Sequence, residues 1–339
     1  KVLLADGSII HCRDLAPAQL EEQLSGNSRE SQLYQGLLKI VSDNREEILE
    51  RFPKVMRRVG GYNLDEFLGD HWNLSRIITG SESTLGLILS AKVKLVPNPA
   101  HQSVCVVHFD SFYESIAHVS EIVRFGPAAV ELLDELLIQK SRENIETRRY
   151  CGFIEGNPKG ALVVEFYGNN KEDSSSKAVQ MADHLKAKGI GYAYPVFSEA
   201  EEIRKIFTVR QKGLGLLMGV KGNRKPIAFI EDAAVPLEHL ADYIMEVYEV
   251  CRQEQTPVVA YAHASVGLLH VKPMLDLRDA QDIQRMKNIS LKTLALVQKY
   301  KGSWSGEHGD GLARGPYNEL FFGKKLYQAF RQTKELFDP

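Results

Sequence analysis

The sequence predicts an α+β protein of two domains, the second of which carries a mostly antiparallel sheet. The length of 339 residues corresponds to about two domains of roughly 100–200 residues each. The tripeptide Pro97-Asn98-Pro99 is typical of a linker, and it separates residues 1–98 from residues 99–339. After this linker, short strand-like runs alternate with longer runs of helical periodicity.

Before the linker, apolar spacing and turn residues predict each element. Residues 1–13 have the pattern of a hairpin, and residues 29–52 carry apolar side chains at helical spacing. We expect strands near residues 77–78 and over residues 85–95, with a polar loop between them.

After the linker, the pattern predicts repeated strand–helix–strand units. Strands are predicted at residues 104–109, 161–168, 192–197, 227–232, 258–264 and 268–273. Helices are predicted at roughly residues 111–124, 128–140, 172–187, 199–211, 236–252, 279–300 and 323–336.

Composition excludes several classes of function. The chain is 44% hydrophobic and 25% charged with a net charge of −2, so we expect a globular protein with no nucleic-acid partner. No apolar run reaches the roughly 20 residues that span a bilayer, so no transmembrane segment is expected. The four cysteines are scattered and form no CxxC pair, which fits a reducing compartment such as the cytoplasm.

The first candidate site is the segment HASVGLLH. His263 and His270 flank an expected tight turn, so their imidazoles can converge on one metal ion. With Glu307, they offer two nitrogens and one oxygen, a set that suits zinc, iron or manganese. The alternative is one histidine in the core and one on the surface.

The second candidate site is the glycine-rich segment SWSGEHGDG, residues 303–311. Glycine permits backbone angles that aim the adjacent Glu307 and His308 at one point. His308 suits a general base near neutral pH. A solvated turn is the alternative.

Two further features have the chemistry of binding sites. The segment GSESTLG, residues 80–86, offers amides and hydroxyls that suit a phosphate or a polar cofactor edge. Arg210 shares an expected helix with apolar residues and suits a substrate carboxylate, which a guanidinium binds with two parallel hydrogen bonds. An ordinary loop and a solvated helix face are the alternatives.

Together these segments resemble the FAD-dependent 2-hydroxy-acid dehydrogenases of the vanillyl-alcohol-oxidase superfamily, which include D-lactate, glycolate and D-2-hydroxyglutarate dehydrogenases. GSESTLG is similar to the family's GSEGTLG, HASVGLLH to HxGDGNLH, and SGEHGDGLARG to SGEHGxG. GGYNLDEF, residues 60–67, and AAVELLDELL, residues 128–137, also match, and the resemblance covers essentially the whole chain. It is strongest for the long branch, which carries an iron–sulfur domain.

The resemblance implies a fold and a role for each site. Residues 1–98 would be the second half of a VAO/PCMH-type FAD-binding domain, and residues 99–339 a ferredoxin-like α+β substrate (cap) domain. The metal ligands would be His263, His270 and Glu307. His308 would be the base, and Arg210 would bind the substrate carboxylate. The residues lining the flavin would be Gly80, Ser81, Glu82, Ser83, Thr84 and Gly86.

The chain also departs from the family pattern. Ser83 stands where the family has glycine, and Ser265-Val266 stands where it has Gly-Asp, which removes a partner for the metal ligands. The glycine-rich pyrophosphate loop is absent and the chain stops at residue 339, so we expect it to be truncated at both ends. We further expect the isolated chain to bind no FAD and to form a homodimer through exposed strand edges.

The expected activity of the full protein is oxidation of a small D-2-hydroxy acid, with electrons leaving to a separate acceptor. The implied cofactors are FAD and a divalent metal, with any iron–sulfur cluster outside this chain. The expected location is the cytoplasm, with peripheral attachment to the membrane left open. The alternatives are a metal-dependent hydrolase and a non-catalytic metal-binding fragment.

Overall fold

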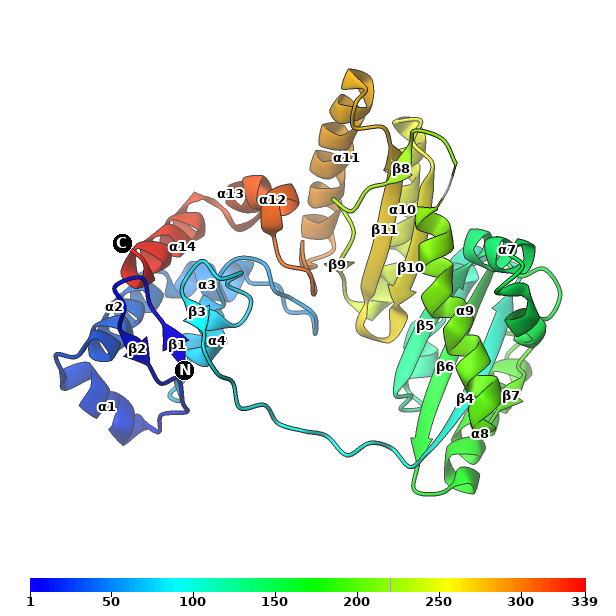
Figure 1. Ribbon diagram of the computed structural model, residues 1–339, viewed down its shortest axis with the longest axis horizontal. Coiled ribbons are helices and arrows are strands. Elements are labelled where there is room, and N and C mark those ends of the chain that lie inside the picture. Colours follow the sequence, from blue (N-terminus) through cyan, green and yellow to red (C-terminus); the bar gives the residue numbers. More distant parts are fainter. Residues whose placement is uncertain (220) are drawn as a thin grey trace. The chain divides into compact units, whose positions relative to one another are not determined.

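The chain forms two compact units in a computed structural model that describes residues 1–219 and 221–339 (Figure 1). The first unit comprises Lys1–Lys54, Arg58–Val96 and Ser303–Pro339. The second unit comprises Val55–Arg57 and Pro97–Gly302. The chain therefore passes from one unit to the other at the predicted linker, but it returns to the first unit after Gly302.

The return of the chain has a physical cause in the last helix, α14 (Lys324–Phe337). Its apolar face is buried, and the guanidinium of Arg29 on α2 (Arg29–Asp43) donates a hydrogen bond of 2.7 Å to the carbonyl oxygen of Leu336. Gly36 on α2 leaves room for the Leu336 side chain, because an added Cβ would lie 2.6 Å from it. The sequence alone predicts that all residues after 98 belong to the second domain, whereas Ser303–Pro339 lie in the first unit.

The first unit combines a small antiparallel sheet with helices. Strand β1 (Val2–Leu3) lies between β2 (Ile9–Ile10) and β3 (Leu87–Ile88). The other elements are α1 (Pro17–Ser25), α2, α3 (Arg45–Arg51), η1 (Leu64–Phe67), α4 (Ser75–Ile78), α12 (Gly311–Arg314), η5 (Gly315–Tyr317), α13 (Asn318–Phe322) and α14.

Several predictions for the first unit change in detail. The N-terminal hairpin is confirmed, and the predicted helix over residues 29–52 is two helices that meet at Asn44. The predicted strand at residues 77–78 is wrong, because these residues end the short helix α4. The Asn73 side chain accepts a hydrogen bond of 2.9 Å from the amide of Ser75, which starts this turn.

The second unit is built on an eight-stranded sheet in the order β7-β4-β6-β5-β10-β11-β8, with β9 paired to β11. Every strand pair in its described part is antiparallel, so the prediction of a mostly antiparallel α+β domain is confirmed. The strands are β4 (His101–Phe109), β5 (Ala129–Asp134), β6 (Gly160–Gly168), β7 (Val196–Phe197), β8 (Lys225–Pro226), β9 (Ala233–Ala234), β10 (Val258–His263) and β11 (Leu268–Leu275).

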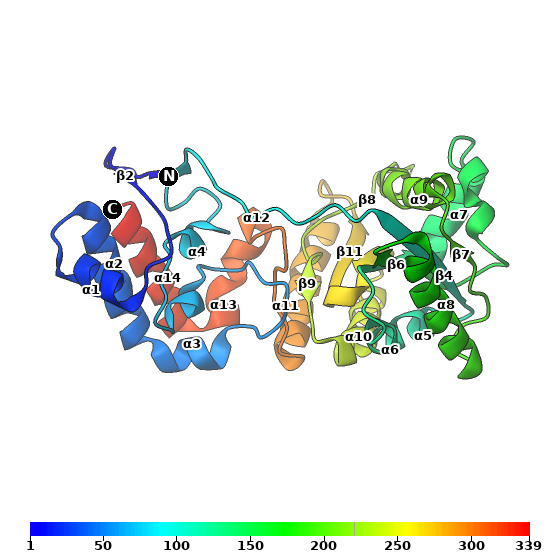
Figure 2. The same ribbon diagram turned by 90° about the horizontal axis from the view of Figure 1, so that it is seen from below.

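Helices cover both faces of this sheet. Helices α7 and α9 lie on one face, and α5, α6, α8, α10 and α11 lie on the opposite side (Figure 2). The α7–α9 face buries a core that includes Val104, Leu133 and Ile206. The helical segments are α5 (Phe112–Ala117), α6 (Val119–Val123), α7 (Glu135–Glu143), η2 (Arg148–Phe153), α8 (Lys171–Ala187), α9 (Ala200–Met218), η3 (Leu237–His239), α10 (Leu240–Gln253), η4 (Ala264–Val266) and α11 (Ala280–Lys299).

Two predictions for this unit are wrong. The predicted helix over residues 128–140 is a strand followed by a helix, β5 then α7, because Asp134 ends the strand and caps the helix. The predicted strand over residues 227–232 is not formed, and only the short strands β8 and β9 flank it. No helix in the two described stretches combines the length and the apolar character that a membrane crossing requires.

The cap residue Asp134 gives the stability of the protein a testable pH dependence. Its carboxylate accepts hydrogen bonds from the amides of Leu137 (2.7 Å) and Ala260 (3.3 Å), but burial raises its pKa to about 6. Because the folded state holds this proton more tightly than the unfolded state, stability falls as pH rises from about 4 to about 6.

We expect Asp134→Asn to remove this loss, because asparagine still caps the helix without a charge. Between pH 4 and pH 7, the free energy of unfolding of the wild type should fall by up to about 3 kcal/mol more than that of the variant. Urea unfolding of both proteins at the two pH values measures the drop. If the two proteins differed in unfolding free energy by the same amount at pH 4 and at pH 7, Asp134 would not be the source of the pH dependence.

Candidate functional site

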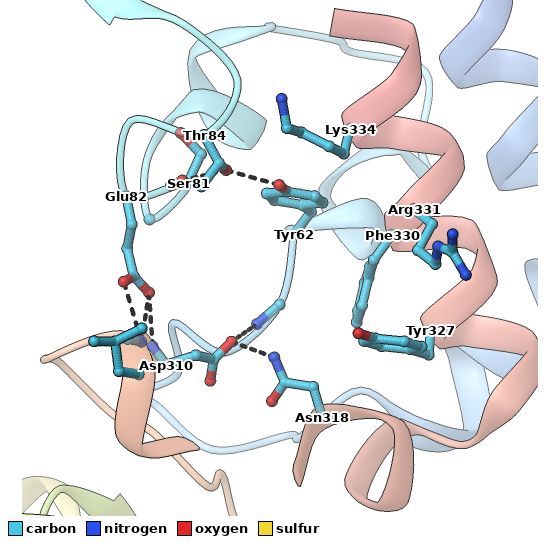
Figure 3. A pocket seen from close by; sticks show the side chains of 14 residues that line it. Tyr62, Ser81, Glu82, Thr84, Asp310, Asn318, Tyr327, Phe330, Arg331 and Lys334 are labelled. Atoms are coloured by element: carbon cyan, nitrogen blue, oxygen red, sulfur yellow. Dashed lines mark hydrogen bonds between the residues drawn. The ribbon is translucent and has the colours of Figure 1, made fainter. Parts of the chain in front are cut away.

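The first unit contains a pocket of about 490 Å³ that is built from segments far apart in sequence (Figure 3). Gly61 and Tyr62 come from the GGYNLDEF segment, and Gly80, Ser81, Glu82 and Thr84 come from GSESTLG. Asp310 and Gly311 come from the end of SWSGEHGDG. Three of the motifs that carry the family resemblance therefore meet at one cavity.

Glu82 connects two of these motifs. Its carboxylate accepts hydrogen bonds from the backbone amides of Asp310 (2.7 Å) and Gly311 (3.1 Å) (Figure 3). A Cβ added to Gly309 would lie 2.5 Å from the Glu82 carboxylate, so a side chain at this position would have to displace Glu82 from these amides. Glu82 thus lines the pocket, but its carboxylate is engaged by the backbone of the neighbouring loop.

Asp310 connects the third motif. Its Oδ2 accepts hydrogen bonds from the amide of Gly61 (2.8 Å) and from the Asn318 side chain (2.6 Å). Burial raises the pKa of Asp310. Its Oδ1 and the Oδ1 of Asn318 are buried, and neither has a hydrogen-bond partner among the residues that the structure describes. Asp310 and Asn318 thus both line the pocket, and each keeps one side-chain oxygen enclosed by the protein.

The opposite wall carries hydroxyls, aromatic rings and cations. The Tyr62 hydroxyl lies 2.7 Å from Oγ1 of Thr84, and burial raises the pKa of Tyr62. Helix α14 contributes Arg331 and Lys334 (Figure 3). Lys334 pairs with Asp338, whereas Arg331 makes no ion pair within residues 1–219 and 221–339. Two cations beside two hydroxyls suit an anionic, polar ligand such as a phosphate ester.

Two of the six residues predicted to line the flavin, Ser83 and Gly86, are not among the residues that line this pocket. Gly86 packs against β1, where an added Cβ would lie 2.8 Å from Val2 and 2.9 Å from the carbonyl oxygen of Leu3. The exposed Ser83 has a φ of 62°, in the left-handed region. This explains why glycine is the family's residue at this position.

We expect Ser83→Gly to stabilise the protein by about 1 kcal/mol, because a left-handed backbone strains residues with a Cβ. Urea unfolding measures the gain, and Ser83→Ala is the control that should bring none. A stability equal to that of the wild type in both variants would show that the loop relaxes to another conformation.

The second unit holds the two predicted metal-binding histidines on one face of its sheet. His263 ends β10, and His270 lies on β11, directly opposite Tyr261 in the register. The η4 turn and Gly267, with a φ of 70°, connect the strands. The two imidazole rings lie 5.2 Å apart, centre to centre, at an angle of 85°. The predicted hairpin is therefore confirmed, and it brings both imidazoles together.

Arg210 lies beside His263, but it is already engaged. Its Nη2 donates a hydrogen bond of 2.5 Å to Glu131 on β5, and the same nitrogen lies 3.2 Å from Nδ1 of His263. Further along the same sheet face, Lys272 pairs with Glu231 at 3.1 Å and lies over the Tyr261 ring. The histidines are thus surrounded by paired charges rather than by isolated ones.

Glu307 and His308 belong to the first unit, whereas His263, His270 and Arg210 belong to the second. Their loop is held within the first unit by backbone and side-chain hydrogen bonds around Ser305. The carbonyl oxygen of Ser305 accepts from the amide of Val59 at 3.0 Å, and its hydroxyl donates to Gly309 at 3.0 Å. The roles of Glu307 and His308 remain predictions.

Sequence reasoning missed several residues of these sites. Tyr62 and Asp310 lay inside quoted motifs without a role, and Arg331 and Lys334 lay in a segment read only as a helix. Glu131 was hidden because its segment was predicted to be helical. Asp134, a cap residue followed by Glu-Leu-Leu, is the signal that could have divided that segment and placed Glu131 on a strand.

Comparison with known proteins identifies the family. A family model described as "FAD linked oxidases, C-terminal domain" matches residues 98–339. The chain belongs to this family of FAD-linked oxidases. The predicted membership is therefore confirmed.

Relatives of this FAD-linked oxidase chain include two kinds of dehydrogenase. The D-2-hydroxyglutarate dehydrogenase of Pantoea ananatis is 32% identical over 351 residues, which cover 100% of this chain and 34% of that protein. The D-lactate dehydrogenase of Archaeoglobus fulgidus is 26% identical, and the match covers 83% of this chain and 58% of that protein. The chain spans about a third of the length of the D-2-hydroxyglutarate dehydrogenases it matches.

A solved structure supports the fold of this FAD-linked oxidase chain. The 4-ethylphenol oxidase of Gulosibacter chungangensis, in a complex with isoeugenol, superposes with a TM-score of 0.51 at 11% identity. The superposition covers 73% of this chain and 53% of that one. This likeness concerns the fold alone.

Proposed function

We propose that the whole protein is an FAD-dependent dehydrogenase that oxidises a small D-2-hydroxy acid of the lactate, glycolate and 2-hydroxyglutarate class. The observation that carries the proposal is the assembly of three family motifs around one pocket of the first unit. The family match and the names of the relatives support the same reaction class.

The pocket has the donors and acceptors that part of an FAD molecule requires. Ser81 and Thr84 supply hydroxyls, and Arg331 and Lys334 supply positive charge for phosphate groups. Bound FAD would supply the hydride acceptor of the reaction. We expect the 339-residue chain alone to retain less FAD than the whole protein, because the chain spans about a third of its relatives' length.

The second unit and the SWSGEHGDG loop would handle the substrate. His263 and His270 would bind a divalent metal ion with Glu307, and this ion would supply Lewis-acid polarisation of the substrate oxygens. His308 would take the proton of the substrate hydroxyl. Arg210 would bind the substrate carboxylate with N–H groups that it does not give to Glu131, since a guanidinium has five. The roles of Glu307 and His308 rest on the motif.

The test is reduction of the protein-bound flavin by D-2-hydroxy acids. The whole protein, loaded with FAD and Zn²⁺ or Mn²⁺, should lose its visible flavin absorbance with at least one member of a panel of D-2-hydroxy acids. The matching L-acids should leave the absorbance unchanged. His308→Ala should slow the reduction by about 10²-fold or more, because general-base catalysis contributes about 10²–10⁴-fold.

The exposed His101 at the start of β4 provides a matched control, and His101→Ala should react like the wild type. A flavin that no acid of the panel reduces would refute the proposed activity. The family match counts against the hydrolase alternative, and stable FAD retention by the whole protein would exclude that alternative in its simple form.

A further inference from the structure

We propose that Glu131 is a positioning residue that prepares His263 for metal binding and holds Arg210 beside it. The inference rests on the proposed function, because it concerns the same metal site. It assigns a role to a side chain that none of the family motifs singled out as a ligand or a base.

The sheet register places Glu131 next to His263. Strand β5 pairs with β10 so that Glu131 lies directly opposite His263. Directly opposite residues of an antiparallel pair point to the same face, about 4.5–5.5 Å apart at their Cβ atoms. The Glu131 side chain is only 12% exposed, so water solvates little of its charge. A carboxylate in this position must find donors within the protein.

The contacts determine which nitrogen of His263 carries the proton. Nδ1 lies 2.9 Å from Oε1 of Glu131 and 3.1 Å from its Oε2. An unprotonated Nδ1 would direct its lone pair at two carboxylate oxygens, which is repulsive. A proton on Nδ1 turns both contacts into attraction, and Nε2 is then the nitrogen with the lone pair that a metal ion needs. This is the way carboxylates commonly orient metal-binding histidines.

The Arg210 guanidinium favours the same arrangement. Its Nη2 donates to Oε2 of Glu131 at 2.5 Å, a charge-assisted bond that is shorter than its 3.2 Å approach to Nδ1 of His263. Glu131 therefore accepts the shorter hydrogen bond from Nη2, and Nδ1 of His263 can donate to the same carboxylate. One carboxylate thus fixes both the imidazole and the guanidinium.

The neighbours of Glu131 on this sheet face indicate that it serves the proposed metal site and not the packing of the apolar core. The next position on this face is Leu133 on β5 and Tyr261 on β10, and Val259 follows on β10. Leu133 and Val259 are buried in the apolar core between the sheet and helices α7 and α9. The polar cluster begins where this core ends. A carboxylate here adds nothing to apolar packing. In the described part of the chain, its ion pairs are with the histidine and the arginine of the proposed site.

The first test is metal affinity of the 339-residue chain, measured by competition for Zn²⁺ with a chromogenic chelator. Glu131→Ala should weaken Zn²⁺ binding by about 10- to 100-fold, as losing the carboxylate partner of a metal-binding histidine typically does. Glu131→Gln should lose less, because the amide oxygen still accepts the Nδ1 proton. His263→Ala should lose more than either.

The matched control is Glu135→Gln. Glu135 lies in the same unit on α7 and pairs with Lys159 at 2.7 Å, so the variant removes a similar charge away from the histidines. Its Zn²⁺ affinity should equal that of the wild type. Equal affinity of Glu131→Ala and the wild type would overturn the proposal, and so would absence of Zn²⁺ binding by the wild type.

The second test reads the His263 tautomer by ¹⁵N NMR without any metal. The wild type should show the proton on Nδ1, and Glu131→Ala should shift the population toward Nε2–H. A wild-type Nε2–H tautomer would overturn the proposal. Both tests are independent of catalysis, so they distinguish the two hypotheses. The positioning role can hold for a protein that oxidises no hydroxy acid, and it can fail for one that does.

Discussion

Replacing Gly267 with alanine should destabilise the protein by at least about 3 kcal/mol, a loss that belongs to the severe class of single substitutions. Gly267 has a φ of 70°, and a Cβ at this position would lie 2.1 Å from the carbonyl oxygen of Val235. That oxygen is backbone, and Val235 is held in place by its own hydrogen bond of 2.9 Å to the Gly267 carbonyl oxygen. The turn between His263 and His270 must therefore open, and Zn²⁺ affinity should fall with stability.

A second glycine separates backbone strain from collision. Gly189, in the same unit, has a φ of 69° and no atom within 4 Å of an added Cβ. Gly189→Ala should therefore cost only about 1–2 kcal/mol, the strain of the left-handed conformation alone. Urea unfolding of the two variants gives the difference. Equal losses would mean that the Val235 segment moves away and that the turn tolerates a side chain.

The second large effect is expected from Asp310→Ala, at about 2–4 kcal/mol. The substitution leaves the amide of Gly61 and the Asn318 side chain without their acceptor, and each unsatisfied buried group costs about 1–3 kcal/mol. It also removes the hydrogen bond that connects the GGYNLDEF segment to the SWSGEHGDG loop. Urea unfolding gives the loss, and FAD retention by the whole protein should fall with it.

Asp43→Ala is the control for this variant. Asp43 is exposed at the end of α2, so its loss should change stability by less than about 0.5 kcal/mol. Asp310→Asn should lie between the two, because one amide oxygen still accepts a hydrogen bond. If Asp310→Ala were as stable as the wild type, water would be replacing the carboxylate, and Asp310 would not connect the motifs.

Local patterns were sufficient to predict some parts of this structure and not others. The β10–β11 hairpin was predictable because two apolar runs flank a short segment that contains glycine, and the turn itself then brings His263 and His270 together. The segment AAVELLDELL was misread because its apolar residues fit both helical and strand spacing. Only pairing with β6 and β10 decides that its first part is a strand.

The pocket of the first unit was predictable as separate motifs but not as one site. Nothing local to Gly61 indicates that its amide donates to Asp310, which is 249 positions away in sequence. The roles of Arg331 and Lys334 depend in the same way on where α14 packs. Glu131 could not be predicted for two reasons. The apolar spacing of its segment fits both a helix and a strand, and its partners His263 and Arg210 lie on other elements.

The interrupted first unit has a consequence for the order in which the protein is made. Its last helix docks on α2 only after the whole second unit has been synthesised, and the contact between Arg29 and Leu336 joins residues 307 positions apart. Closing so long a loop is slow compared with local folding. On the ribosome, the second unit can complete its sheet while the N-terminal segments still await their C-terminal helix. Until that helix emerges, the exposed face of α2 is a surface that chaperones would recognise.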